Sequence, residues 1–120
     1  MSQPTHVVAI IPCNDLPASI AFYGMLGFAP APGPEWDGYV ILTDGKGGNL
    51  HLTLAPAGWL IPGKSPFGLY IYTDDVEVLA QRLGDRLLHP PEEKPWGMLE
   101  FAVSDPDENL VRVGRRLLRP

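Results

Sequence analysis

Side chains able to perform covalent or acid–base chemistry are few in this sequence. Cys13 is the only cysteine, and the neighbouring Asp15 disfavours the thiolate that a reactive cysteine needs. Ser19 and Ser104 fit a helix surface and a turn, and no Gly-x-Ser-x-Gly or phosphate-binding motif occurs. Glu100 alternates with apolar residues on an expected strand, and between a binding cleft and solvent we favour solvent. The sequence therefore predicts no catalytic residue.

Aromatic residues form the second group with a chemical role. Their rings bind flat or cationic ligands through stacking and cation–π contacts, worth roughly 0.5–2 kcal/mol each. Tyr72 belongs to the same group of rings, and the alternative is that half or more of the group are core or dimer contacts. We predict a ligand-binding set, mostly aromatic and drawn from strands and loops: Trp36, Tyr39, His51, Trp59, Phe67, Tyr70, Trp96 and Met98.

Two of the three histidines need separate interpretation. His51 lies on an expected strand, where a lone histidine is more often a hydrogen-bonded core or rim residue than a direct ligand contact. We favour the hydrogen-bonded role while keeping His51 in the candidate set. His89 stands between two prolines and is expected at the surface.

Composition and charge indicate one domain and exclude several classes of partner. A chain of 120 residues is long enough to bury a core without disulfides, and a single cysteine allows no internal disulfide. The net charge is −5, and some of the basic residues lie in one C-terminal cluster: Arg112, Arg115, Arg116 and Arg119. A nucleic-acid-binding protein needs a basic face, so we expect no nucleic-acid partner. No apolar run approaches the ~20 residues of a membrane span, and the N-terminus lacks a signal-peptide pattern. We therefore expect a cytoplasmic protein with no membrane partner.

The elements that must position these residues follow one plan twice. In the first half, the expected order is strand, helix and three strands, at residues 5–12, 16–26, 28–31, 35–43 and 49–55. Asp15 precedes the first helix as a cap, and Pro17 lies in its opening turn. In the second half, the same order recurs at residues 67–73, 76–83, 87–88, 98–103 and 110–116, with a loop expected at 90–95. Such internal repetition predicts two similar modules.

Two stretches carry a resemblance to a known family. One reads Trp96-Gly-x-x-Glu-Phe-x-x-x-Asp-Pro-Asp107, followed by Glu108 and Asn109, and the other is the apolar strand before the Asp15 helix start. Together they resemble the vicinal oxygen chelate superfamily, which includes glyoxalases, bleomycin-resistance proteins and extradiol dioxygenases. The family usually has Gly at Glu108, where a positive φ would cost a glutamate about 1 kcal/mol.

The resemblance implies an α+β fold in a single domain, residues 1–120. Two βαβββ modules, at about 5–56 and 67–116, would form curved mixed sheets around a cleft. Enzymes of the superfamily hold a divalent metal through four strand positions, which fall here on Val8, His51, Gly68 and Arg112. Only His51 can ligate a metal, and a displaced His6/His51 pair would make a weak site. We therefore expect no metal and no other cofactor.

The motif resembles the bleomycin-resistance branch most, which implies a homodimer with two clefts at the subunit interface. We expect a metal-independent small-molecule binding protein that sequesters a cationic, aromatic-containing antibiotic of the bleomycin type and leaves it chemically unchanged. The acidic balance is compatible with such a ligand. Two alternatives stay open: a metal-dependent lyase, isomerase or dioxygenase of the glyoxalase group, and a binding protein for an unrelated metabolite.

Overall fold

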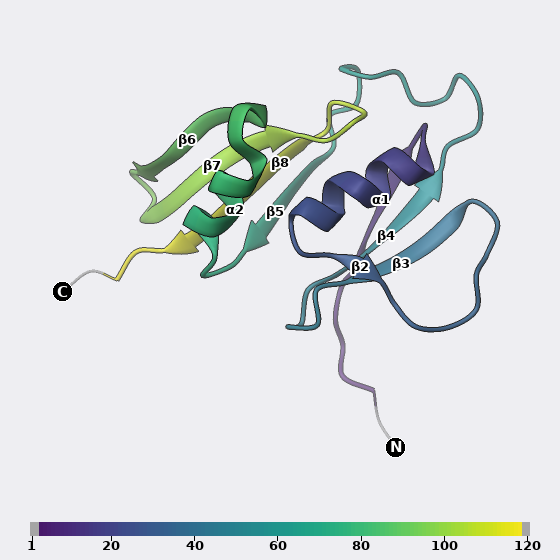
Figure 1. The fold of residues 1–120 in the computed structure, drawn as a ribbon, viewed down its shortest axis with the longest axis horizontal. Coiled ribbons are helices and arrows are strands. Elements are labelled where there is room, and N and C mark those ends of the chain that lie inside the picture. The colour runs from purple at the N-terminus through teal and green to yellow at the C-terminus, as the bar shows by residue number, and fades with distance from the viewer. Residues whose placement is uncertain (1–2, 119–120) are drawn as a thin grey trace. The chain divides into compact units, whose positions relative to one another are not determined.

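The computed structural model describes residues 3–118, in two compact units that meet in sequence between Ala57 and Gly58 (Figure 1). We call residues up to Ala57 unit one and those from Gly58 unit two, and describe each by itself. The last arginine of the basic cluster, Arg119, lies outside the described residues. Within residues 3–118, no helix is long and apolar enough to cross a bilayer.

Unit one is a four-stranded mixed sheet with one helix. Its elements, in chain order, are β1 (Ala9–Cys13), α1 (Leu16–Met25), β2 (Ala29–Pro30), β3 (Tyr39–Thr43) and β4 (Asn49–Leu54). The strands lie in the order β1-β4-β3-β2, and only β1 and β4 are parallel. The Asp15 side chain accepts a hydrogen bond from the backbone N–H of Ala18 at 3.0 Å, so α1 begins with the expected cap.

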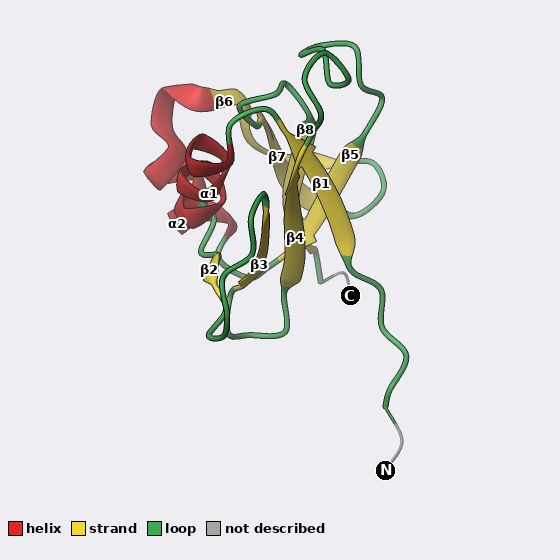
Figure 2. Ribbon diagram, turned by 90° about the vertical axis from the view of Figure 1, so that its right-hand side faces the viewer, coloured by secondary structure: helices red, strands yellow, loops and turns green. Residues whose placement is uncertain are grey.

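Unit two repeats this arrangement. It contains β5 (Gly68–Tyr72), α2 (Val76–Leu83), the 3₁₀ helix η1 (Gly84–Arg86), β6 (Leu87–Lys94), β7 (Met98–Ser104) and β8 (Leu110–Arg116). Its strand order, β5-β8-β7-β6, is that of unit one, and again only the first strand and its neighbour are parallel. The predicted duplication is therefore confirmed, and Figure 2 distinguishes the strands and helices of both units.

The core of each unit lies between its helix and one face of its sheet. In unit one, buried residues of β4 such as Leu50 and Leu52 face α1, which buries Phe22 and Tyr23. In unit two, alternate residues of β7 and β8, including Phe101, are buried on the side of α2. Because side chains alternate along a strand, the intervening residues lie on the opposite face, which we call the helix-free face of each unit.

Three expected element boundaries were wrong. β1 begins at Ala9 rather than residue 5, and β3 begins at Tyr39 rather than residue 35. The loop expected at 90–95 is the greater part of β6, which extends to Lys94. β6 lies at the sheet edge and pairs only with β7, with register shifts on either side of His89. Prolines are tolerated there because an edge strand has N–H positions without a ladder partner.

The turn between β7 and β8 depends on one buried carboxylate. Asp105 Oδ1 accepts the backbone N–H groups of Asp107 and Asn109, both at 2.9 Å, and its Oδ2 accepts the Asn109 amide at 3.0 Å. Glu108 has a φ of 62°, the left-handed conformation in which the family usually has glycine. A residue with a Cβ is strained in this conformation.

Replacing Glu108 with glycine should therefore stabilise the protein by about 0.5–1 kcal/mol, because it removes the left-handed strain. Urea unfolding of the wild type, E108G and E108A measures this change. E108A removes the same carboxylate but keeps the Cβ, so it should bring no comparable gain. Equal stabilisation by both variants would assign the effect to the side chain and contradict the backbone explanation.

Candidate functional site

The helix-free face of unit two gathers several of the predicted site residues. Strand pairing places Tyr70, Arg112 and Ala102 in one row across β5, β8 and β7. The next row consists of Tyr72, Gly114 and Glu100. Met98, at the start of β7, lies on the same face and is buried, and Trp96 lies in the turn just before it. The face thus combines aromatic rings with charged groups.

Glu100 lies beneath these side chains, and the expectation that it faces solvent was wrong. Its exposed fraction is 1%. Its Oε1 accepts hydrogen bonds from the Tyr70 hydroxyl at 3.0 Å and from the Trp96 indole N–H at 2.9 Å. The Arg112 Nε lies 4.0 Å from its Oε2. Alternation correctly assigns Glu100 to the helix-free face, but neighbouring side chains cover it there.

Gly114 provides the space for this arrangement. A Cβ at this position would lie 2.4 Å from the Tyr70 hydroxyl oxygen and 2.9 Å from the Glu100 Cβ, closer than side chains pack. The absence of a side chain lets the Tyr70 hydroxyl pass over β8, from β5 to Glu100 on β7. This packing therefore requires glycine at position 114, which the sequence pattern did not identify.

The environment of Tyr70 favours its neutral form. Burial raises the pKa of the Tyr70 phenol well above its ordinary value of 10.0. The hydrogen bond to Glu100 and the negative charge of that carboxylate raise this pKa further. Tyr70 is thus a stable hydrogen-bond donor to Glu100.

Two aromatic rings on this face are largely exposed. Tyr72 is 64% exposed, and the Arg116 guanidinium lies 5.8 Å from the centre of its ring. Trp96 is 59% exposed, with the Lys94 ammonium 5.9 Å from its ring centre. The centres of the Tyr70 and Tyr72 rings are 4.7 Å apart. The face therefore combines exposed aromatic rings with cations, and Glu92, which pairs in register with Glu100, adds a carboxylate bonded to Lys94.

Unit one contains a separate apolar hollow of about 400 Å³, lined by Trp36, Tyr39 and Ile41. A second hollow of about 340 Å³ shares these residues and extends to Glu35 and the prolines of the 30–34 segment. An isolated antiparallel β-bridge joins Trp36 to Tyr39 and holds the backbone of Trp36 next to β3. Ile41, which the sequence interpretation missed, follows from the alternation of β3.

His51 lies beside this hollow as a hydrogen-bonded rim residue, the role we favoured from the sequence. It is half-buried on β4, in one row with Ile10 and Ile41. Its Nδ1 and the Tyr39 hydroxyl share a hydrogen bond of 2.5 Å, and the two rings meet edge to face. This contact orients the Tyr39 ring.

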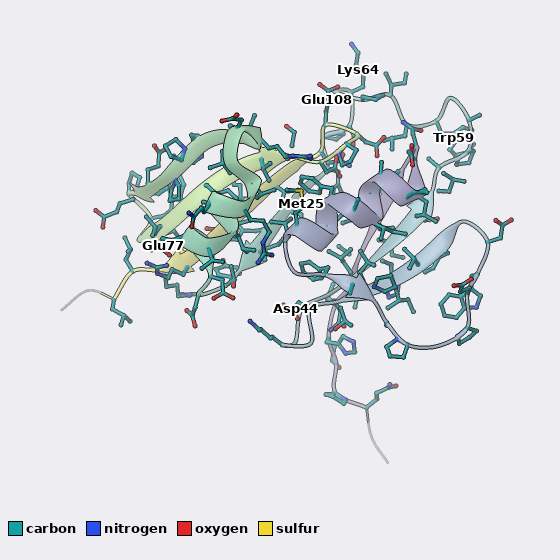
Figure 3. All side chains as sticks on the ribbon, in the orientation of Figure 1. Met25, Asp44, Trp59, Lys64, Glu77 and Glu108 are labelled. Atoms are coloured by element: carbon teal, nitrogen blue, oxygen red, sulfur yellow. The ribbon has the colours of Figure 1, made fainter. Side chains whose placement is uncertain are left out.

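Trp59 and Phe67 are not among the residues described above for the helix-free face of unit two or for the hollow of unit one. Trp59 is 81% exposed in the long loop that precedes β5, where Figure 3 shows it projecting from the chain. Phe67 is half-buried directly before β5. Their place in the candidate set therefore remains a prediction from the sequence.

The residues at the expected metal-ligand positions do not fit a metal ion. Val8 and Gly68 have no side-chain donor, and Arg112 carries a permanent positive charge. His51, the remaining position, already hydrogen-bonds Tyr39. Across residues 3–118, no group of three or more His, Cys, Asp or Glu side chains is placed to hold a metal. A divalent ion needs about three or more such ligands.

Comparison with known proteins gives one family and several similar structures. The family model described as the Glyoxalase/Bleomycin resistance protein/Dioxygenase superfamily matches residues 3–113. A bleomycin-binding protein solved in complex with bleomycin is 26% identical, with a TM-score of 0.77, and the match covers 94% of this chain and 99% of that one. A bleomycin resistance determinant encoded on the transposon Tn5 is 27% identical, with a TM-score of 0.77 and coverage of 95% and 100%.

TioX from Micromonospora sp. ML1 shares the fold at 20% identity, with a TM-score of 0.72 and coverage of 95% and 100%. No curated protein matches the sequence.

The contact between Tyr70 and Glu100 predicts a specific pH dependence. Because the Tyr70 pKa is raised in the folded state, its contribution to stability is complete below the ordinary value of 10.0 and is lost as pH rises through the folded value. In a spectrophotometric titration, the wild type should show one tyrosine that ionises at unusually high pH. Y70F should lose this signal, and Y72F should retain it. E100Q should lower the Tyr70 pKa, because it removes the carboxylate charge but leaves the burial. An unchanged late ionisation in E100Q would contradict this account.

Proposed function

The chain belongs to the Glyoxalase/Bleomycin resistance protein/Dioxygenase superfamily, and from this premise we propose that it sequesters a bleomycin-type antibiotic without altering it. Its two four-stranded mixed sheets, each with a helix, have the α+β vicinal oxygen chelate fold. Two bleomycin-related structures match almost the whole chain. The observation that carries the proposal is the aromatic hollow formed by Trp36, Tyr39 and Ile41.

The hollow of unit one suits a flat, cationic ligand. Trp36 and Tyr39 present ring surface on which a heteroaromatic group can stack, at roughly 0.5–1.5 kcal/mol beyond the area buried. The carboxylates of Glu35 and Asp37 flank Trp36 in sequence, and both residues are exposed. Negative charge beside an aromatic wall favours a cation over a neutral molecule of the same shape.

Binding without turnover is consistent with the acidic groups near the aromatic residues. Glu100 is buried, and its Oε1 already accepts two hydrogen bonds, so it is not placed to exchange a proton with a ligand. The expected metal-ligand positions supply a single donor residue, His51. Protection would then follow from mass action. The protein must be present at a higher concentration than the drug, and the dissociation constant must lie below the concentration at which the drug acts.

The proposal includes a homodimer of single-domain chains and the complete predicted ligand-binding set. The family resemblance implies the dimer, and exposed apolar side chains such as Ile10 on the helix-free face of unit one support it. A symmetric dimer would bury such a face against a second copy.

Copper-loaded bleomycin should bind the EDTA-treated protein saturably, at micromolar affinity or tighter and one ligand per chain, as measured by calorimetry. W36A should weaken binding about tenfold, because it removes one of the two aromatic rings that line the hollow. W36F keeps an aromatic ring and should bind nearly as the wild type does. Unchanged affinity in W36A would contradict this use of the hollow, and absence of binding by the wild type would contradict the antibiotic ligand.

A further inference from the structure

The hollow of about 340 Å³ in unit one reaches from the helix-free face to the side of the sheet that carries α1. Tyr39 and Ile41 line it from the helix-free face. Val40 lines it from the opposite face, because it pairs in register with Leu52, which is buried toward α1. The hollow therefore passes around the edge of the sheet at β3.

The shortness of β2 leaves this edge of the sheet to a loop. β2 has two residues and pairs with Leu42 and Thr43, in the second half of β3. Beside the first half of β3, the hollow is lined by the 30–34 segment, which begins the wide arc between β2 and β3 in Figure 1. The Ala31 N–H donates a hydrogen bond to the Ile41 carbonyl at 2.9 Å, so the segment is tied to the sheet.

We call one part of this hollow the proline arm, which is lined by Leu16, Ile20, Val40 and residues 30–34. Leu16 and Ile20 lie one turn apart on α1, a helix whose ten residues include no charged side chain. Prolines at positions 30, 32 and 34 fix the backbone φ of the loop. A wall that is already rigid loses little conformational freedom when a ligand binds. The proline arm is therefore a pre-formed aliphatic surface.

The charge at the opening of the hollow is negative. Among its lining residues, all of which lie in the described part of the chain, Glu35 is the only charged one, and it is exposed. Asp37, two residues further along the chain, is exposed as well. These carboxylates favour a cation and repel an anion.

We propose that the hollow selects an amphiphilic ammonium compound, whose aliphatic chain enters the proline arm while its aromatic ring lies against Trp36 and its cationic nitrogen lies beside Glu35. This inference rests on the proposed function, because it uses the same hollow, and it adds an aliphatic chain to the ligand class. Small-molecule sites commonly have volumes of roughly 300–1,000 Å³, and this hollow lies at the lower end of that range. A compact ligand of this kind can therefore fill it.

The probes are benzyldimethylalkylammonium ions whose alkyl chain is lengthened stepwise from methyl to hexyl, titrated by calorimetry below their micelle concentrations. Each added methylene should tighten binding to the wild-type protein about threefold to fourfold until the arm is full, because burial of a methylene contributes about that factor. I20W fills the arm and should reduce the gain per methylene to almost none. V78W adds the same ring at an exposed position of α2 and should keep the wild-type gain.

Removal of one carboxylate tests where the cationic nitrogen lies. E35Q should weaken the binding of every member of the series by about threefold, since the Glu35 charge is exposed and partly screened. The gain per methylene should stay the same, because the arm is intact. D85N removes an exposed carboxylate in η1 and should change neither quantity.

Two further measurements separate this inference from the antibiotic proposal. The indole N–H signal of Trp36 should shift when an alkylammonium ion binds, and copper bleomycin is titrated separately. A gain per methylene without bleomycin binding would support the proline arm and contradict the antibiotic. Bleomycin binding with equal affinity for all chain lengths would do the reverse.

If I20W does not fold, the wild-type series and the Trp36 signal still decide. Absence of a gain per methylene in the wild type, the same gain in folded I20W, or a Trp36 signal that does not move would overturn the proline arm.

Discussion

The hydrogen-bonded burial of the Glu100 carboxylate is the constraint on which the helix-free face of unit two depends. A carboxylate removed from water is costly unless donors replace its hydration. Tyr70 and Trp96 donate two such bonds, and the Arg112 guanidinium lies nearby. One buried charge therefore fixes the orientation of a phenol and an indole. Gly114 makes this possible, because any side chain there would occupy the position of the Tyr70 hydroxyl.

This constraint gives the two units different chemistry on the same strand plan. Unit two hides its central carboxylate and exposes aromatic rings with cations. Unit one instead has a hollow lined by Trp36, Tyr39 and Ile41, and its histidine is paired with Tyr39. The repeated strand order positions comparable faces, while individual residues on those faces determine what each can bind. The two helix-free faces therefore differ in chemistry, although their strands follow one plan.

The repeated fold could be predicted from the sequence, because helix caps and turns depend on residues that are close together in the chain. The Asp15 cap and the turn beginning at Asp105 depend on residues a few positions apart, and the resemblance identified the strand plan. The environment of Glu100 could not be predicted in the same way. Its burial depends on Tyr70, thirty residues away, and on the missing side chain of Gly114. The prolines of β6 likewise indicated a loop, because only the sheet order shows that this strand is an edge.

The claim that this protein captures its ligand unchanged is tested most directly by recovering that ligand. The EDTA-treated protein would be incubated with copper bleomycin, freed of unbound drug by gel filtration, denatured and examined by mass spectrometry. The account predicts one intact drug molecule per chain, with no new product after prolonged incubation. A modified drug, or conversion of more drug molecules than there are chains, would show catalysis and contradict sequestration. Failure to retain any drug would contradict the proposed ligand.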